Sequence, residues 1–486
     1  MKPVAASATP VVPAHTRLSR LFTKLSRAAG ALRSPEHPGF VEASLVSGSR
    51  VFASSAIFAA LALALGGGHL SIAAIAAFPF LSRLAHIAVP SILRRHGSGR
   101  LAIAATWVER VGLLLASIAG IVRPEGWALA GFLGGLAVAQ LGQAVYDVAM
   151  ASLHSEATAA EGFGRYTATK TRWAAISGLV LGILASFAVD AIEALGVPPH
   201  IARSLAIVGG VAIHLRLSRP LARMGALARR AANDHVPRPT TPLRTASVSP
   251  ARDLPISWGV VRFALAWGFA LGLSTRQGEA MAISVLDLSV GTLTLLNALL
   301  VGGGVLGAKT WGVLADRFGG KGLMSIALIA IALDPLWMLA AMLIHPALLI
   351  PGYAVYGVFN SGWNIATNIT LVRTAGAPAD RIRALIVYNI AFGLAAGTAP
   401  LLGGLLLELV EAHVDTIAAY ATLFVLAAVL RLSAYPLLRL MPAPPARRGR
   451  YVSVVVLRAV RFRSKRSVIG QREPTKSRRG VPVPEP

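Results

Sequence analysis

The feature that most constrains this chain is a series of long apolar runs separated by short polar connections. A helix needs about 20 mainly apolar residues to cross the hydrocarbon core of a bilayer, and backbone groups inside that core must pair within their own segment. The sequence therefore predicts an all-α integral membrane protein. The twelve predicted transmembrane segments are 46–67, 70–93, 100–122, 127–152, 170–192, 200–217, 256–282, 290–313, 322–345, 347–372, 383–408 and 415–438.

Composition excludes several kinds of chemistry. Hydrophobic residues make up 55% of the 486 residues and charged residues only 14%, against about 25% charged in a typical soluble domain. The chain has no cysteine, so disulfides, thiolate nucleophiles and cysteine-ligated metals are excluded. Its 11 histidines show no metal-ligand spacing, and no phosphate-binding G-x-x-x-x-G-K-[ST] loop occurs. We predict no catalytic residues, no metal and no cofactor, and therefore not an enzyme.

The net charge of +26 is explained by membrane topology rather than by nucleic acid, because the basic residues are segregated by connection. They gather in the N-terminal tail, in the even-numbered connections and in the linker between the sixth and seventh segments, whereas the odd-numbered connections are nearly free of them, with Arg123 the main exception. Lys and Arg concentrate on the cytoplasmic side of membrane proteins. We therefore expect both termini to be cytoplasmic, no nucleic-acid partner, and a multi-pass protein of a bacterial plasma membrane.

The same reading divides the chain into five parts. These are a basic amphipathic tail at 1–45, a six-helix bundle at 46–217, a cytoplasmic linker at 218–255, a second six-helix bundle at 256–440 and a basic tail at 441–486. The N-terminal tail fits an interfacial helix, although a mitochondrial presequence remains an alternative. The C-terminal tail is either attached to an anionic inner leaflet or solvated.

One connection carries a recognisable motif. Residues 312–322 read G-V-L-A-D-R-F-G-G-K-G, which resembles the cytoplasmic loop signature of the major facilitator superfamily at the position where the second half of such a protein repeats it. The resemblance implies two pseudo-symmetric bundles of six helices. It also implies a gating role for this loop, with Asp316 as a latch carboxylate, Arg317 and Lys321 as its basic companions, and Gly312 and Gly319 allowing close packing and a tight turn.

The first half contains an altered copy of this motif at 90–100. Arg94 stands where the copy would have its aspartate. If the family's loop latches the bundle in one conformation, this departure predicts an asymmetric or weakened gate in the first half.

Two polar stripes recur at matching positions in the two halves. The stretches 142–149 and 359–366 share a side-chain amide at their second position, an aromatic ring at the fifth and Asp or Asn at the sixth, at spacings of three and four residues that place them largely on one helix face. By the resemblance, the fourth and tenth segments line a central cavity, so we predict a solute site there; the alternative is that the amides only join helices together. The predicted substrate-binding residues are Gln140, Gln143, Tyr146 and Asp147 in the fourth segment, and Tyr356, Asn360, Trp363 and Asn364 in the tenth.

Asp147 is the candidate for proton coupling. Removal from water favours the protonated form of a carboxyl group, so Asp147 can take up and release a proton as a cavity alternates between sides. The alternative is an ionised Asp147 paired with a basic residue of a neighbouring helix, such as Arg50.

Other charges inside the segments are assigned to pairs or to the scaffold. Arg83 and Glu109 lie at similar distances from the turn around Gly97, which predicts a neutralising pair. Arg276 and Glu279 are three residues apart, so they either pair on one helix face or contact an ionic substrate. Structural roles are expected for Arg110, Asp334 and Arg431.

The sequence thus predicts a secondary active transporter of a small organic solute, working by alternating access. Amides with aromatic residues suit a sugar, a polyol or a drug-like amphiphile, and a highly anionic substrate is less favoured. The expected partners are this small molecule and the bilayer, and a monomer is the simplest state. The alternative is a non-transporting receptor, sensor or assembly factor on the same fold, with lipid translocation as a third option.

Overall fold

A computed structural model describes residues 38–52, 55–122, 127–157, 163–233, 258–374 and 378–441. Every regular element in these ranges is a helix. Most of the two predicted tails and the second part of the linker, 234–257, lie outside the described residues. The predicted amphipathic helix near the N-terminus therefore belongs to the part of the chain that is not described.

The first half of the described chain forms one bundle. Its elements are α2 (Pro38–Phe52), α3 (Ser55–Ala64), α4 (His69–Leu81), η1 (Ser82–Ile87), α5 (Val89–His96), α6 (Ser98–Ile121), α7 (Trp127–Ala157), α8 (Phe163–Ala194), α9 (Pro199–Leu215) and α10 (Ser218–Asn233). The first part of the predicted linker is thus helical, because Leu217, Leu221 and Met224 form an apolar side that is buried in the bundle.

The second half forms another bundle. Its elements are α11 (Trp258–Gly272), α12 (Gln277–Ser284), α13 (Val290–Phe318), α14 (Gly320–Ala332), α15 (Asp334–Leu343), η3 (Pro346–Leu348), α16 (Leu349–Thr374), α17 (Pro378–Glu411), α18 (Thr416–Ser433) and η4 (Pro436–Leu440). Two helices begin at side-chain caps: Ser289 accepts a hydrogen bond from the backbone N–H of Thr292, and Asp415 from that of Ala418. Such caps satisfy backbone donors that a helix start leaves open.

The predicted membrane class is confirmed. Among the described residues, 11 helical stretches are long and apolar enough to cross a membrane. The helix α16 occupies the position of the tenth predicted segment and is 26 residues long, but it is not one of these 11 stretches. Asn360, Asn364 and Asn368 make it less apolar, so the exception is the helix that carries one of the predicted polar stripes.

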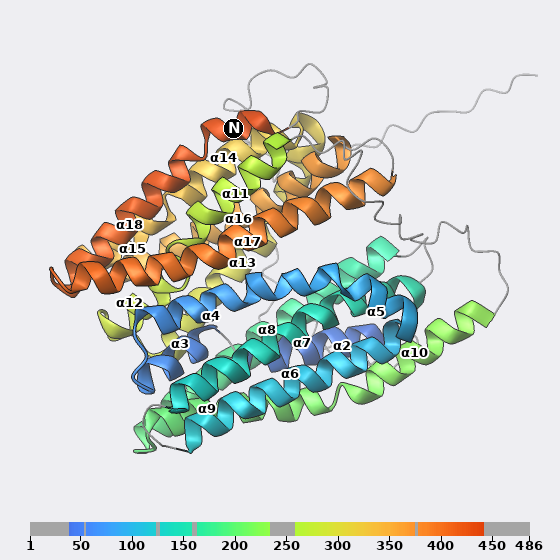
Figure 1. The fold of residues 1–486 in the computed structure, drawn as a ribbon, viewed down its shortest axis with the longest axis horizontal. Helices are drawn as coiled ribbons and strands as arrows, with labels where there is room; N and C mark the ends of the chain where they lie inside the picture. Colours follow the sequence, from blue (N-terminus) through green and yellow to red (C-terminus); the bar gives the residue numbers. More distant parts are fainter. Residues whose placement is uncertain are drawn as a thin grey trace, which may run out of the picture.

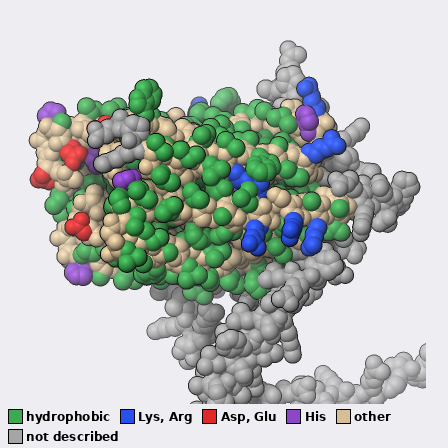
Figure 2. All heavy atoms as spheres, turned by 90° about the horizontal axis from the view of Figure 1, so that it is seen from below, with side chains coloured by type: hydrophobic (Ala, Val, Ile, Leu, Met, Phe, Trp, Pro, Cys, Tyr) green, Lys and Arg blue, Asp and Glu red, His purple; other side chains and the backbone are tan. Residues whose placement is uncertain are grey.

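The two bundles lie side by side (Figure 1), with α2–α10 in one and α11–η4 in the other. Figure 2 shows a surface of the first bundle that is covered by apolar side chains between two polar ends. Lys and Arg gather at one end, here called the basic end, which includes the exposed residues Arg94, Arg95 and Arg100. The other, here called the acidic end, includes Glu408, Glu411 and Asp415.

The bundles share a core toward the acidic end. One apolar cluster contains Ile57 and Leu61 from α3, Phe132 from α7, Leu293 from α13 and Tyr353 from α16. Two further clusters near the basic end each belong to a single bundle. The bundles are therefore packed against each other at one end and more separate at the other.

Close contact between the bundles depends on small residues of α17. A Cβ atom added to Gly404 would lie 2.7 Å from the carbonyl oxygen of His69 in α4. A Cβ on Gly397 would lie 2.7 Å from the side chain of Leu81, at the other end of α4. Small residues let helix backbones approach closely inside a membrane, so α4 and α17 form a tight seam between the halves.

Candidate functional site

An ion-pair cluster lies at mid-depth in the first bundle, centred on Arg50 of α2. Its guanidinium contacts both carboxylate oxygens of Glu109 in α6, with Nε–Oε1 at 3.0 Å and Nη2–Oε2 at 3.2 Å. Its Nη1 donates to Oδ1 of Asp147 in α7 at 3.1 Å. Unpaired charge is costly inside a membrane, and here one arginine serves two carboxylates.

Asp147 therefore adopts the arrangement of the second sequence-based interpretation, in which it pairs with Arg50. Its side chain is nevertheless 51% exposed, whereas that of Glu109 is 4% exposed. The two carboxylates differ in how many of their oxygens Arg50 already holds. Glu109 is held on both oxygens, while Asp147 presents part of its carboxylate to open space.

The expected Arg83–Glu109 pair is wrong, because Glu109 pairs with Arg50 instead. The reason lies in the path of the chain before Gly97. After Pro79 the α-helix α4 gives way to the 3₁₀-helix η1, which contains Arg83. The change from 3.6 to 3.0 residues per turn alters the direction of the side chain, and Arg83 lies over the ring of Phe80, with its Cζ 5.4 Å from the ring centre.

A second polar cluster lies nearer the basic end of the same bundle. Tyr146 donates its hydroxyl hydrogen to Oε1 of the buried Glu42, and Nε2 of His154 lies 3.3 Å from the other oxygen of Glu42. The Arg50 guanidinium lies over the Tyr146 ring at 5.3 Å, a cation–π contact that joins the two clusters. Tyr146 is thus a buried connector rather than a freely exposed ligand-binding group.

A wide cavity of about 620 Å³ lies beside these clusters. The lining from α2 and α7 includes the charged residues Glu42, Arg50 and Asp147. The rest of the lining comes from α8 of the same bundle and α13 of the other and is largely apolar, with Lys170, Thr294 and Asn297 among its polar residues. A cavity of this size falls in the range of small-molecule sites.

A smaller chamber of about 250 Å³, here called the central chamber, is lined by nine residues of the first bundle and one of the second, and it shares Arg50 with the wide cavity. The first bundle contributes Glu109, Gln140 and Gln143, and the second contributes Arg276. The remaining lining is apolar: Phe58, Ile75, Pro79, Leu113 and Ala139. The predicted residues of the fourth segment are therefore divided, with Gln140 and Gln143 at the chamber and Tyr146 and Asp147 at the wide cavity.

The predicted residues of the tenth segment lie elsewhere. Trp363 is 5% exposed and packs against Trp267 of α11, with ring centres 4.8 Å apart. Tyr356 packs against the same apolar cluster. Asn364 is exposed, and its carbonyl accepts a hydrogen bond from the Asn368 side chain. Neither cavity described above is lined by Tyr356, Asn360, Trp363 or Asn364, so these two cavities do not bring the two stripes together.

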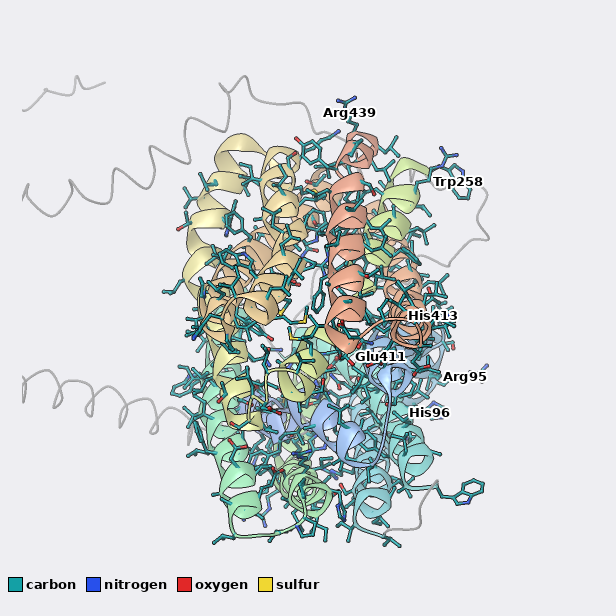
Figure 3. The ribbon with its side chains drawn as sticks, turned by 90° about the vertical axis from the view of Figure 1, so that its left-hand side faces the viewer. Arg95, His96, Trp258, Glu411, His413 and Arg439 are labelled. Atoms are coloured by element: carbon teal, nitrogen blue, oxygen red, sulfur yellow. The ribbon has the colours of Figure 1, made fainter. Side chains whose placement is uncertain are left out.

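The acidic end is closed by a set of contacts that we call the seal, formed by His69, Gln277, Glu408 and Glu411. His69 Nε2 lies 2.7 Å from Glu411 Oε2, and the Gln277 side chain donates to the His69 carbonyl at 3.2 Å. The backbone N–H of Leu70 donates to Glu408 at 3.0 Å. Figure 3 looks onto this end, where Glu411 lies at the junction of the two bundles.

A second contact between the bundles lies on the same side of the cavities. The backbone N–H of Gly291 in α13 donates to Asp190 in α8 at 3.0 Å, and the hydroxyls of Ser186 and Thr294 are 2.5 Å apart. Together with the seal, these contacts close the molecule between the cavities and the acidic end.

The predicted gating motif begins within α13 and ends within α14. Gly319 between them has a φ of 79°, the left-handed region that a tight turn uses, and Gly97 has the same φ at the corresponding turn of the first bundle. Close packing is not found at Gly312, where an added Cβ would meet open space; it occurs at Gly320, next to Thr370 and the Ala366 carbonyl. Lys321 donates to the carbonyls of Arg439 and Met441. The side chains of Asp316 and Arg317 lie outside the described residues.

The remaining intramembrane charges make contacts within their own bundle. Arg431 of α18 contacts Asp334 of α15 at 3.1 Å and also donates to the carbonyl of Ile331. Arg110 is buried, donates to the His214 carbonyl at 2.6 Å and lies over the Trp107 ring. Arg276 pairs with Glu279 at 2.9 Å, which was one of the two arrangements expected for these residues.

Sequence patterns identified the polar side chains of α7. They predicted the wrong partner for Glu109, and they did not place Arg276 at the same cavity as Gln140 and Gln143. The first signal was the three- and four-residue spacing of the polar side chains on α7, which places them on one helix face. A usable second signal was the presence of charged residues inside the segments, since Arg50, Glu109 and Asp147 lie within three predicted segments and need partners of opposite charge there. No local pattern places Arg276 of the second half opposite Gln140, because that depends on how the two bundles dock.

Comparisons with known proteins agree with this architecture. Residues 230–442 match the family model described as PUCC protein, and no curated protein matches the chain. The nucleoside transporter NupG is 14% identical, with 84% of this chain and 99% of that chain covered at a TM-score of 0.61. The xylose transporter XylE from E. coli, in an inward open conformation, is 12% identical, with 86% and 99% covered at 0.59.

A bacterial homologue of the iron transporter ferroportin, in an inward-facing state, is 15% identical, with 83% of this chain and 98% of that chain covered at a TM-score of 0.56. At these identities the similarity establishes the fold. The chain has the major facilitator fold of two six-helix bundles, as the motif at 312–322 indicated.

Proposed function

We propose that this protein is a secondary transporter that moves a small organic solute across a bacterial plasma membrane by alternating access. The central chamber carries the proposal, because both halves contribute polar groups to it: Arg50, Gln140 and Gln143 from the first and Arg276 from the second. A solute that touches both halves can favour one relative orientation of the bundles over the other. The similar structures include a nucleoside transporter, a xylose transporter and a homologue of an iron transporter, which supports this class of function.

The conformation fits an inward-facing state. We place the basic end in the cytoplasm, following the distribution of Lys and Arg. The seal would then close the outer side, and the wide cavity would receive solute from the inner side. Anionic lipids of the inner leaflet are the proposed partners of the basic end, and the transporter would work as a monomer.

For the solute, the amides of Gln140 and Gln143 suit hydroxyl groups, and the apolar lining suits a carbon skeleton. This combination supports a sugar, a polyol or a drug-like amphiphile. Purified protein in liposomes preloaded with unlabelled solute should take up the same solute in labelled form without any ion gradient. An absence of counterflow for these classes, in their neutral and their acidic forms alike, would contradict transport.

Asp147 remains the proposed site of proton coupling. Protonation would release it from Arg50, because a neutral carboxyl has no ionic attraction to a guanidinium. Asp147→Asn should therefore abolish uptake driven by a pH gradient while leaving counterflow intact. Asp415→Asn, at an exposed helix cap, is the matched control; gradient-driven uptake that is unchanged in Asp147→Asn would remove the coupling role.

A receptor or assembly factor on the same fold is the second candidate. It is favoured by Arg94, which replaces the acidic position of the repeated loop motif and is exposed at the basic end. Such a protein would show ligand or partner binding with no solute exchange, so the counterflow assay separates the two.

A further inference from the structure

The chain changes conformation abruptly where it reaches the central chamber from the second bundle. The helix α11 ends at Gly272 and α12 begins at Gln277, and Arg276 between them has a φ of 69°. A non-glycine residue rarely adopts this left-handed region and keeps it only where surrounding contacts hold it. Interrupted helices near the membrane midplane are a recurrent way of building solute sites.

The polar side chains that line the chamber differ in how many of their hydrogen-bonding atoms already have a partner within the protein. Both oxygens of Glu109 are held by Arg50. Arg276 uses Nη1 for Glu279, and one third of its side chain, 33%, is exposed. Within the described part of the chain, the side-chain amides of Gln140 and Gln143 make no hydrogen bond. The chamber therefore presents a guanidinium edge and two amides to whatever enters it.

The charges around the chamber set the class of ligand. Arg50 and Arg276 are balanced by Glu109 and Glu279, and Asp147 lies on the far side of Arg50. Two guanidinium groups thus stand against three carboxylates, so no surplus of positive charge is available to hold a dianion such as a phosphate monoester. A single carboxylate can be shared by the free edge of Arg276, in the forked geometry that guanidinium groups favour.

The volume of the chamber and its apolar lining limit the size and shape of the ligand. About 250 Å³ accommodates a compact molecule rather than a long chain, and Phe58, Ile75 and Leu113 provide apolar surface for its carbon atoms. The amides of Gln140 and Gln143 can bind hydroxyl or carbonyl groups next to the carboxylate.

From this geometry we infer that the substrate is a small monocarboxylic acid whose carboxylate binds Arg276, while its neutral polar groups bind Gln140 and Gln143. The inference rests on the proposed function and narrows its substrate class. Arg276 is then a specificity-determining residue that joins the two halves through the ligand.

The position of Arg276 also connects the ligand to the seal. The next residue, Gln277, is buried and donates its side-chain amide to the His69 carbonyl. A carboxylate that repositions Arg276 acts on the same interrupted segment that holds the acidic end closed. Occupancy of the chamber and opening of the seal are therefore linked through residues 273–277.

The test uses matched pairs of acid and neutral molecules: gluconate with sorbitol, and benzoate with benzamide. Counterflow into liposomes is measured for the wild type, Arg276→Gln, Arg276→Lys and Arg262→Gln, the last being an exposed arginine on α11 that serves as the control. The same compounds are tested for thermal stabilisation of each purified protein in detergent. Monodisperse elution shows that each variant is folded.

We expect the wild type to exchange at least one acid about tenfold faster than its neutral partner, a difference of about 1.4 kcal/mol. Arg276→Gln should lose this preference, Arg276→Lys should keep part of it, and Arg262→Gln should keep all of it. Faster exchange of the neutral partners, or an acid preference that survives in Arg276→Gln, overturns the inference and leaves transport standing.

The two proposals fail in different ways. Stabilisation by an acid that disappears in Arg276→Gln, without counterflow of any compound, would support the carboxylate site and contradict transport. The absence of both stabilisation and counterflow by either acid would overturn the inference.

Discussion

At mid-depth the first bundle holds Arg50, Glu109 and Asp147 in one ion-pair cluster, whereas the second bundle places Trp267 against Trp363. The first arrangement depends on partners, because each charge is tolerable only while the opposite charge is present. The second depends on shape, since aromatic rings contribute through packing. The two halves repeat one fold and are stabilised by different interactions.

This difference assigns different roles to the halves. The clustered charges of the first bundle line both cavities, so a ligand or a proton can alter them. The aromatic cluster of the second bundle is buried and provides a rigid wall, from which Arg276 reaches the chamber. In the proposed transporter, most polar groups at the cavities therefore belong to the first half, and Arg276 is the contribution of the second half to the chamber.

The largest predicted effect comes from breaking the cluster. Arg50→Leu leaves Glu109 and Asp147 without their cation, and removal of one partner from a buried pair costs about 3 to 5 kcal/mol. The unfolding temperature in detergent should fall strongly. The combined variant Arg50→Leu, Glu109→Leu and Asp147→Asn should recover most of the loss, because no charge is then left unpaired.

The control for this prediction is Arg94→Leu, which removes an exposed arginine at the basic end and should change stability by less than about 0.5 kcal/mol. Equal stability of Arg50→Leu and this control would show that the cluster is not held by pairing.

The second-largest predicted effect concerns the aromatic packing in the second bundle. Trp363→Ala removes a buried ring and leaves a void, at a cost of about 3 kcal/mol. Trp363→Phe should retain much of the packing against Trp267 and Phe263. Stability is measured in the same detergent.

The two bundles should differ in which substitution restores the lost stability. In the second bundle an apolar residue of similar shape should suffice, whereas the first bundle needs removal of the partner charges. If Trp363→Phe were as destabilised as Trp363→Ala, the tryptophan would act through its N–H group rather than through packing.

The helices could be predicted because length and apolarity in a bilayer leave few alternatives. The predicted segment 127–152 and the helix Trp127–Ala157 begin at the same residue, and α16 was found even though its amides reduce its apolarity. Local signals also identified the turn at Gly319, where φ is positive. These features depend on residues that are near one another in the sequence.

The site was predicted only in part, because it depends on docking. Spacing on α7 grouped Gln140 with Gln143, and both line the chamber. Spacing on α16 likewise grouped Asn360 with Trp363, but the rotation of that helix buries the Trp363 ring against α11. The partner of Glu109 was missed because a 3₁₀-helix intervenes before Gly97. Rotation and docking are set by packing between distant segments, which single-helix patterns do not contain.

The smallest predicted effect concerns the seal, where both halves contribute polar groups. Glu411→Gln keeps the shape of the side chain but removes the charge next to His69, and a partly exposed pair of this kind contributes about 0.2 to 1 kcal/mol. The seal should then open more often, by a factor of about 1.4 to 5 for a loss of this size. Because the chain contains no cysteine, a single Ile75→Cys substitution in the chamber gives a clean readout of access by a thiol reagent.

The reagent is added from the side of the acidic end, and Ile75→Cys is compared with and without Glu411→Gln. Glu193→Gln is the matched control, since Glu193 pairs with Arg203 within the first bundle and does not join the halves. Faster labelling with Glu411→Gln alone would show that contacts between the halves hold the chamber closed. Equal labelling in all three proteins would mean that the glycine seam at Gly404 closes this end without help from the charges.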